Sequence, residues 1–153
     1  MNPRLLSFVK GNFSQPACAL DLGSGNDLDM KGLVDLGWQV QGVEQPVLAL
    51  KELYSADHPM DLIYSNNVLQ FINDKDSFVD TCLKNLKDNG YLFIQTFAKG
   101  DKIMKNKTFS ERELELLFRD KFRDVKIEKL TVDDDDFLIG PHQHEIFLLT
   151  AKK

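Results

Sequence analysis

Hydrophobic and polar positions along the chain follow two alternating periods. Short apolar runs, typical of buried strands, are separated by stretches in which apolar residues recur at helical spacing. Strands are therefore expected near 17–21, 38–43, 60–65, 91–97 and 144–150, and helices near 3–12, 26–36, 46–54, 78–86 and 110–118. Strands that alternate with helices predict an α/β fold with a mostly parallel sheet.

The final part of the pattern differs, because no helical stretch separates the half-exposed strand at 125–127 from the strand at 144–150. The last strand must then return antiparallel, as a hairpin partner. The connecting loop would leave the carboxyl edge of the sheet, where ligands of open α/β folds bind. This predicts that an acidic loop, Asp133–Asp136, and the segment His142–His144 lie near the first glycine loop of the chain.

That glycine loop belongs to the most informative segment, Ala19–Glu44. Its strand ends at Asp21, and Gly23 and Gly25 allow a sharp turn and a close approach of backbone to a ligand. A helix start follows, whose N–H groups point into the same space. The next strand ends in Glu44, about 20 residues downstream, where an acid accepts hydrogen bonds from ribose hydroxyls. The segment predicts a nucleoside-binding βαβ unit.

Composition narrows the class of protein. The 153 residues fit one domain, residues 1–153, and 42% hydrophobic with 28% charged residues is ordinary for a globular protein. A net charge of −5 disfavours nucleic acid as a partner. Two cysteines, Cys18 and Cys82, lack metal-ligand spacing and indicate a reducing, cytoplasmic setting. The sequence shows no membrane span and no signal peptide at Met1–Arg4.

Several further segments form motifs together with the glycine loop: Asp21–Gly25, Glu44, Asp61–Leu69, Leu86–Leu92, the terminal hairpin, and His142–Lys152. These motifs resemble those of class I S-adenosylmethionine-dependent methyltransferases, and the ending His142–Lys152 is most similar to small tellurite-resistance-type members. The resemblance implies a Rossmann-like methyltransferase sheet, mostly parallel with an antiparallel C-terminal hairpin strand, and S-adenosyl-L-methionine as the cofactor.

The sequence departs from the family pattern in three places. Asp27 stands where a third glycine is common, and its side chain either crowds the methionine moiety or caps the helix. Only sixteen residues separate Glu44 from Asp61, so edge strand 3 of the family is expected to be missing. The segment before the first strand is also short, whereas many relatives use a longer one as a lid.

Transferred residue by residue, the resemblance assigns a cofactor-binding set. Asp21, Gly23, Ser24 and Gly25 are expected on the methionine side. Glu44 is expected at the ribose with Gln45 beside it near the adenine, and Ser65 and Asn66 face the sulfonium region. The alternative for Ser65, Asn66 and Asn67 is an ordinary helix N-cap.

His142 and His144 are the candidate proton-handling groups at this edge. At positions i and i+2 of a strand, both side chains point to one face. They can bind a metal together with Asp133–Asp136, one can act as a base, or the segment is simply polar. A substrate-side catalytic role for His144 is favoured over metal binding, and no metal ligand is assigned. Four lysines, Lys99, Lys102, Lys105 and Lys107, leave the same edge and fit a solvated loop better than an anion-steering one.

The favoured function is methyl transfer to a small-molecule acceptor by in-line displacement, which needs alignment more than a nucleophilic side chain. The acceptor atom is open. One alternative is a degenerate methyltransferase fold that serves as a binding or interaction module. A nicotinamide-dependent oxidoreductase is disfavoured, because Leu28 stands where its fingerprint needs glycine. Loss of the edge strand leaves the second strand free to pair in a homodimer.

Overall fold

The protein is described from a computed structural model that covers residues 1–25, 27–44, 53–136 and 138–153. Its core is a six-stranded sheet in the order β2-β1-β3-β4-β6-β5. The strands are β1 (Cys18–Leu22), β2 (Gln39–Val43), β3 (Met60–Asn66), β4 (Leu86–Phe97), β5 (Arg123–Asp136) and β6 (Gly140–Lys152). β2, β1, β3 and β4 pair in parallel, whereas β6 runs antiparallel to both β4 and β5. The predicted fold class is thereby confirmed, including the antiparallel strand near the C-terminus.

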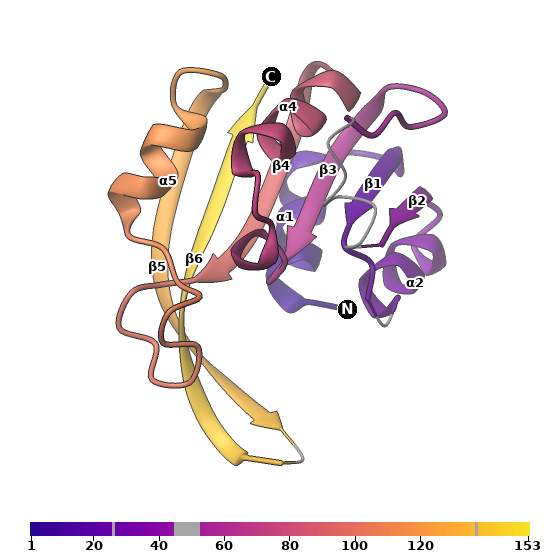
Figure 1. Cartoon of the computed structure of the whole chain (residues 1–153). Coiled ribbons are helices and arrows are strands. Elements are labelled where there is room, and N and C mark those ends of the chain that lie inside the picture. Colours follow the sequence, from indigo (N-terminus) through magenta and orange to yellow (C-terminus); the bar gives the residue numbers. More distant parts are fainter. Residues whose placement is uncertain (26, 45–52, 137) are drawn as a thin grey trace.

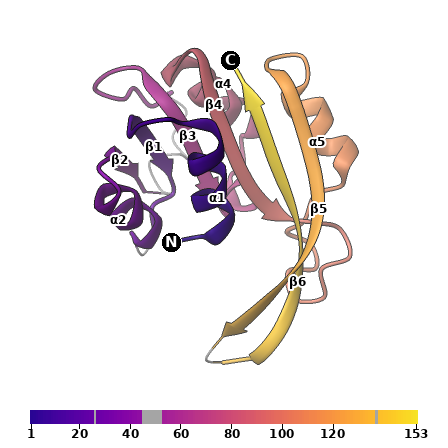
Figure 2. The ribbon, with the colours of Figure 1, turned by 180° about the vertical axis from the view of Figure 1, so that it is seen from behind.

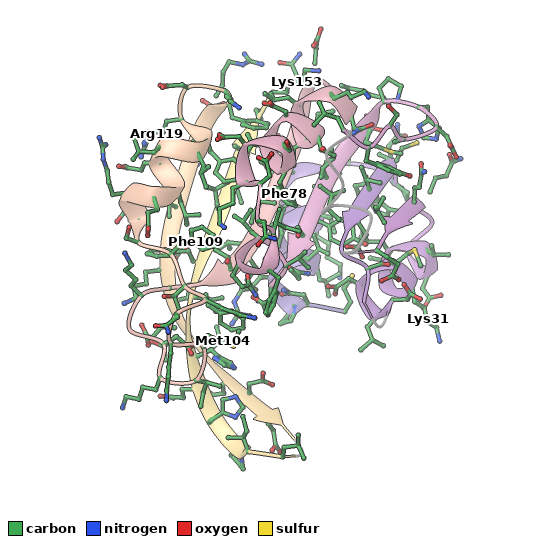
Figure 3. All side chains as sticks on the ribbon, viewed as in Figure 1. Lys31, Phe78, Met104, Phe109, Arg119 and Lys153 are labelled. Carbon is green, nitrogen blue, oxygen red and sulfur yellow. The ribbon has the colours of Figure 1, made fainter. Side chains whose placement is uncertain are left out.

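Helices cover both faces of this sheet (Figure 1). The helices are α1 (Pro3–Asn12), α2 (Leu28–Asp35), the short 3-10 helix η1 (Leu69–Phe71), α4 (Lys75–Asn85) and α5 (Glu111–Phe118). Leu5 of α1 and Leu33 of α2 are buried on one face, which Figure 2 shows from the side of α1. Phe78 of α4 and the nearby Phe109, both labelled in Figure 3, are buried on the other face with α5. No helix of the described residues is long and apolar enough to cross a membrane.

The connection between β2 and β3 is short, as its sequence indicated. Residues 53–59 form no strand, and β2 is the edge of the sheet that the structure describes. Asn85 holds part of this connection in place, because its side chain accepts a hydrogen bond from Ala56 N and donates to Tyr54 O. The helix predicted over 46–54 falls largely outside the described residues, and Leu53 and Tyr54 are not helical.

The hairpin is longer than its sequence predicted. Asp133–Asp136 are not a loop but the end of β5, paired with residues 140–143 of β6. The last residue of β4, Phe97, pairs with Ile146 of β6. Toward the tip of the hairpin, residues 140–145 of β6 therefore pair with β5 and with no other described strand. Figures 1 and 2 show this ribbon extending past the carboxyl ends of the other strands.

Candidate functional site

The turn between β1 and α2 is built around one tightly placed glycine. Gly23 has φ 96°, a left-handed conformation that favours glycine. A Cβ atom at this position would lie 2.4 Å from Cγ2 of Val68, which follows β3. The N–H groups of Gly23 and Ser24 both donate to the carbonyl of Val43, at 2.6 and 3.3 Å. The turn is therefore fixed to the ends of both neighbouring strands.

The predicted ribose acid lies next to this turn. Glu44 is exposed directly after β2, and its Oε1 accepts a hydrogen bond from the Ser24 hydroxyl at 3.2 Å. Gly25 has φ 57°, and among the described residues the only atom within 4 Å of where its side chain would begin is the carbonyl oxygen of Gly23, at 3.7 Å. The structure thus brings Ser24, Gly25 and Glu44 together. Gln45 lies outside the described residues.

Asp21 is a buried acid below the turn, with 4% of its surface exposed. Burial raises the pKa of this carboxyl from 3.8 to about 7, and the negative charges of Asp29, Asp27 and Glu44 act in the same direction. Its partner across to β3 is Tyr64. The Tyr64 hydroxyl lowers the pKa of Asp21, but no contact of this hydroxyl with a described residue has the geometry of a hydrogen bond. Four acids and the buried hydroxyl of Tyr64 therefore meet at the end of β1.

The start of α2 decides one of the two alternatives for Asp27, which were crowding of the methionine moiety and capping of the helix. Asp27 occupies the N-cap position in a left-handed conformation, with φ 57°, and its side chain makes no capping hydrogen bond. The side chain is exposed. Helix capping is therefore not the reason for an acid at this position, and its negative charge near Asp21 is the effect that the structure shows.

A polar network connects the amino-terminal segment to the ends of β3 and β4. Asp29 accepts hydrogen bonds from the backbone N–H of Asn2 and from the side-chain amide of Asn66. The side-chain amide of Asn2 donates to Oδ1 of Asn66 at 3.3 Å and to Oε1 of Gln95 at 3.0 Å. Asn66 therefore lies at the predicted edge, but its side chain is engaged with two neighbours, Asn2 of the amino-terminal segment and Asp29 of α2.

Ser65 has a different environment from Asn66. Its side chain is fully buried, and its hydroxyl donates to the carbonyl of Leu22 at 2.7 Å. This contact joins β3 to the last residue of β1, immediately before the glycine turn. The structure thus places Ser65 beneath the predicted site, where it positions the turn.

We expect Ser65→Ala to lower the free energy of unfolding by about 1–3 kcal/mol, because the buried carbonyl of Leu22 loses its donor. Urea unfolding followed by circular dichroism measures the change. Ser55→Ala is the matched control, since Ser55 is exposed and its substitution should stay within about 0.5 kcal/mol of the wild type. Equal stabilities for the two variants would contradict the positioning role.

The histidines lie in a separate cluster on the hairpin. His144 is buried, and its Nδ1–H donates to Oδ2 of Asp101 at 2.7 Å, in the lysine-rich loop after β4. Its Nε2 lies 3.0 Å from Nε2 of His142 and 3.8 Å from Oδ2 of Asp134. Burial acts to raise the pKa of Asp101, but hydrogen bonds from the Met104 N–H, His144, and the N–H groups of Glu145 and Ile103 lower it below its usual range.

The predicted proximity of this cluster to the glycine loop needs correction. The hairpin does leave the carboxyl edge, as expected, but β6 is the third strand from β1 in the sheet order. At about 4.8 Å per strand, roughly 14 Å separates the two strands. The extended ribbon also carries His142 and His144 beyond the end of β4. The carboxyl edge therefore has two groups of polar residues, one at the turn after β1 and one at the hairpin.

A hollow of about 540 Å³ lies elsewhere on the molecule. Its lining includes Phe8 of α1, Tyr91 of β4, Lys126 of β5 and Lys152 of β6. Tyr91 and Lys152 are paired near the amino edge of the parallel strands. This hollow therefore does not coincide with the residues predicted to bind a nucleoside.

Some residues of both groups were not found from the sequence. No motif contains Asn2, Gln95 or Asp101, and no role was assigned to Tyr64 within Asp61–Leu69. Each of the four meets a partner tens of residues away along the chain. Of these four residues, only Tyr64 could have been found from the sequence pattern, because its polar hydroxyl lies within the apolar run of β3, two residues before Asn66. A polar group in such a run is expected to meet a partner or a ligand.

Comparison with known proteins identifies related domains and folds. A family model described as "Methyltransferase domain" matches residues 2–127. No curated protein matches the sequence significantly. TehB from Haemophilus influenzae superposes with a TM-score of 0.75 at 18% identity, covering 100% of this chain and 62% of that one. The chain thus spans less than two thirds of TehB.

Two further solved structures show the same fold. A SAM-dependent methyltransferase from Methanosarcina mazei has a TM-score of 0.72 at 14% identity, covering 95% of this chain and 96% of that one. Phosphoethanolamine N-methyltransferase 2 from Haemonchus contortus, solved with S-adenosyl-L-methionine, has a TM-score of 0.71 at 16% identity. The match covers 99% of this chain and 52% of that one.

Proposed function

Because this chain belongs to the methyltransferase-domain family, whose methyl donor is S-adenosyl-L-methionine, we propose that it transfers a methyl group from this cofactor to a small-molecule acceptor. The observation that carries the proposal is the turn after β1, where Gly23 is held against Val68 and Ser24 is hydrogen-bonded to Glu44. Such a turn lets the backbone approach a ligand, and Glu44 offers a second carboxylate oxygen to ribose hydroxyls.

The charges at the turn support the same ligand. S-adenosyl-L-methionine carries a positive sulfonium and a positive ammonium group, and this end of β1 collects Asp21, Asp27, Asp29 and Glu44. A cation bound among them would relieve the repulsion that helps to raise the pKa of Asp21. The hydroxyl of Tyr64, unpaired among the described residues, adds a polar group at the same place. The residues present therefore fit the cofactor.

The mechanism that we propose relies on alignment. The cofactor supplies an electrophilic methyl group, and the chain's task is to hold an acceptor lone pair in line with it. Gly23, Ser24, Gly25 and Glu44 would hold the cofactor in one orientation. Such alignment can contribute up to roughly 7–11 kcal/mol to lowering the barrier. A base is needed only for a weakly acidic acceptor, and a catalytic role for His144 stays a prediction.

Ligand-induced stabilisation tests the proposal. At about a hundred times its dissociation constant, S-adenosylhomocysteine should raise the free energy of unfolding by roughly 2.7 kcal/mol, a rise of roughly 5–10 °C in melting temperature. Glu44→Ala should abolish the shift. Asp88→Ala, which removes an exposed acid at the amino end of β4, should keep it, and NADH should produce none.

A non-catalytic binding module is the second candidate. It is favoured by the engagement of Asn66 with Asp29 and Asn2, which occupies a side chain expected to face the sulfonium region. Absence of any shift with millimolar S-adenosylhomocysteine would contradict the enzyme proposal and support this candidate. A shift that persists in Glu44→Ala would contradict the assigned ribose contact.

Two properties of the protein's setting belong to the proposal as well. The thiols of Cys18 and Cys82 are free, and burial raises the pKa of the Cys82 thiol, which suits a reducing compartment such as the cytoplasm. β2 has a strand partner on one side only within the described residues, so a second copy could pair there as a homodimer.

A further inference from the structure

Three side chains converge on one face of the β5–β6 ribbon. His142 and His144 are two residues apart on β6, and Asp134 is the cross-strand partner of His142 on β5. One ligand atom from each of the three side chains lies within 4.8 Å of the other two. Nε2 of His144 is 3.0 Å from Nε2 of His142 and 3.8 Å from Oδ2 of Asp134. Two imidazoles and one carboxylate form a donor set that divalent transition metals bind in proteins.

The hydrogen bonds at the far side of each ring fix which nitrogen carries the proton. Nδ1 of His144 meets Oδ2 of Asp101 at 2.7 Å, and Nδ1 of His142 meets the carbonyl of Gly140 at 2.8 Å. Both partners are acceptors, so each Nδ1 must be the donor. In the neutral rings, both Nε2 atoms are then unprotonated. Ligating histidines are oriented in this way by carboxylates and carbonyls behind them.

The two unprotonated nitrogens face each other. Nε2 of His142 and Nε2 of His144 are 3.0 Å apart, and neither has a proton to donate to the other. Two ligands at a metal–nitrogen distance of about 2.0–2.1 Å stand roughly 2.9–3.4 Å apart in octahedral or tetrahedral geometry. His144 is also buried, with 9% of its side chain exposed, so water cannot readily satisfy its lone pair.

Asp134 is placed to complete the set. Its Oδ1 accepts the backbone N–H of Asp135 at 2.9 Å, which leaves Oδ2 directed to the ring of His144 at 3.8 Å. Its side chain is 58% exposed and free to close the remaining distance. The carboxylate charge would partly neutralise a bound cation.

We propose that His142, His144 and Asp134 bind a divalent transition-metal ion of the Zn²⁺ type, with Asp101 and the carbonyl of Gly140 as positioning groups. The site leaves at least one coordination position for water or another ligand, because it supplies three protein donors. The sequence alone favoured a base over a metal for this segment. The proposal does not depend on methyl transfer, since the cluster is roughly three strand spacings from β1.

Metal titration of the untagged, chelator-treated chain tests the proposal. Calorimetry with Zn²⁺ should give one equivalent bound, and Co²⁺ should produce visible absorption typical of nitrogen and oxygen ligands. His142→Ala should weaken Zn²⁺ binding by at least about tenfold, as should Asp134→Asn. Asp101→Asn should weaken it by about 10–100-fold without removing a ligand.

The third histidine is the matched control. His58 is exposed in the connection before β3, so His58→Ala should leave Zn²⁺ affinity unchanged. Circular dichroism establishes that each variant is folded before titration. A single proton shared between the two Nε2 atoms is the competing account, and it predicts no metal binding. Absence of Zn²⁺ binding by the wild type, equal affinity in His142→Ala, or a loss in His58→Ala would overturn the proposal.

Discussion

Gly23→Ala is expected to lower the free energy of unfolding by about 2–5 kcal/mol and to abolish stabilisation by S-adenosylhomocysteine. The new methyl group would lie 2.4 Å from Cγ2 and 2.9 Å from Cγ1 of Val68, closer than any real contact. Overpacking of this kind costs about 1–3 kcal/mol. The left-handed backbone adds about 1–2 kcal/mol for any residue with a Cβ. Val68 is stiff at χ1 and cannot turn away freely.

The second glycine of the turn separates these two costs. Gly25 has φ 57°, and no side chain of a described residue lies within 4 Å of the position that a methyl group would take there. Gly25→Ala should therefore cost only the backbone strain, about 1–2 kcal/mol. The double variant Gly23→Ala, Val68→Ala should regain part of the stability lost by the turn. Urea unfolding measures the stability of Gly23→Ala, Gly25→Ala and the double variant. If Gly23→Ala is no less stable than Gly25→Ala, contact with Val68 does not constrain the turn.

The ligand-free protein is expected to lose stability as the pH rises from about 4 to about 7, through Asp21. The pKa of this carboxyl is 3.8 when unfolded and about 7 when folded, mainly because it is buried. Between these values the folded state holds a proton that the unfolded state has released, so unfolding becomes easier with rising pH. The difference between the two pKa values corresponds to a loss of roughly 4 kcal/mol in the free energy of unfolding, and this loss is complete above pH 7. The melting temperature should fall by about 10 °C.

Asp21→Asn isolates this contribution. The amide has nearly the same shape and does not ionise, so the variant should lack the fall between pH 4 and 7 that the wild type shows. Other carboxyls have pKa values below their usual range, namely those of Asp74, Glu113 and Glu145. Their effects on stability lie at lower pH and are the same in the wild type and in the variant. Thermal melts of the wild type and the variant from pH 4 to 8 measure how the melting temperature of each depends on pH. Parallel curves for the two proteins would contradict a raised pKa at Asp21.

The βαβ unit could be predicted from the sequence because its signals are local. Gly23, Gly25 and Glu44 stand at fixed positions relative to two apolar runs, and the structure places them together. Ser65 shows the limit of this reasoning. The strand was located correctly, but whether its hydroxyl faces a ligand or Leu22 depends on which face of β3 packs inward at its end.

The ends of elements were less predictable, because tertiary pairing decides them. The strand after the helix at 78–86 was expected to begin only at residue 91, yet the helix ends at Asn85 and β4 begins at Leu86, paired with Met60. Asp133–Asp136 have poor strand propensity, but pairing with 140–143 holds them in β5. The contact of Asp101 with His144 joins residues 43 positions apart, and no local pattern reports it.

The order of the strands also constrains how the chain is made. Among the strands that the structure describes, β5 pairs only with β6, and β6 fills the place between β4 and β5. A ribosome that has released β5 but not β6 therefore carries a strand with no place in the sheet, next to an open edge of β4. Synthesis at about 5–20 residues per second leaves this edge unprotected for roughly 3–11 seconds, the time needed to add the residues from the end of β4 to the end of β6. Exposed edges of this kind are aggregation hazards, so chaperone contact during translation would be most valuable at this stage.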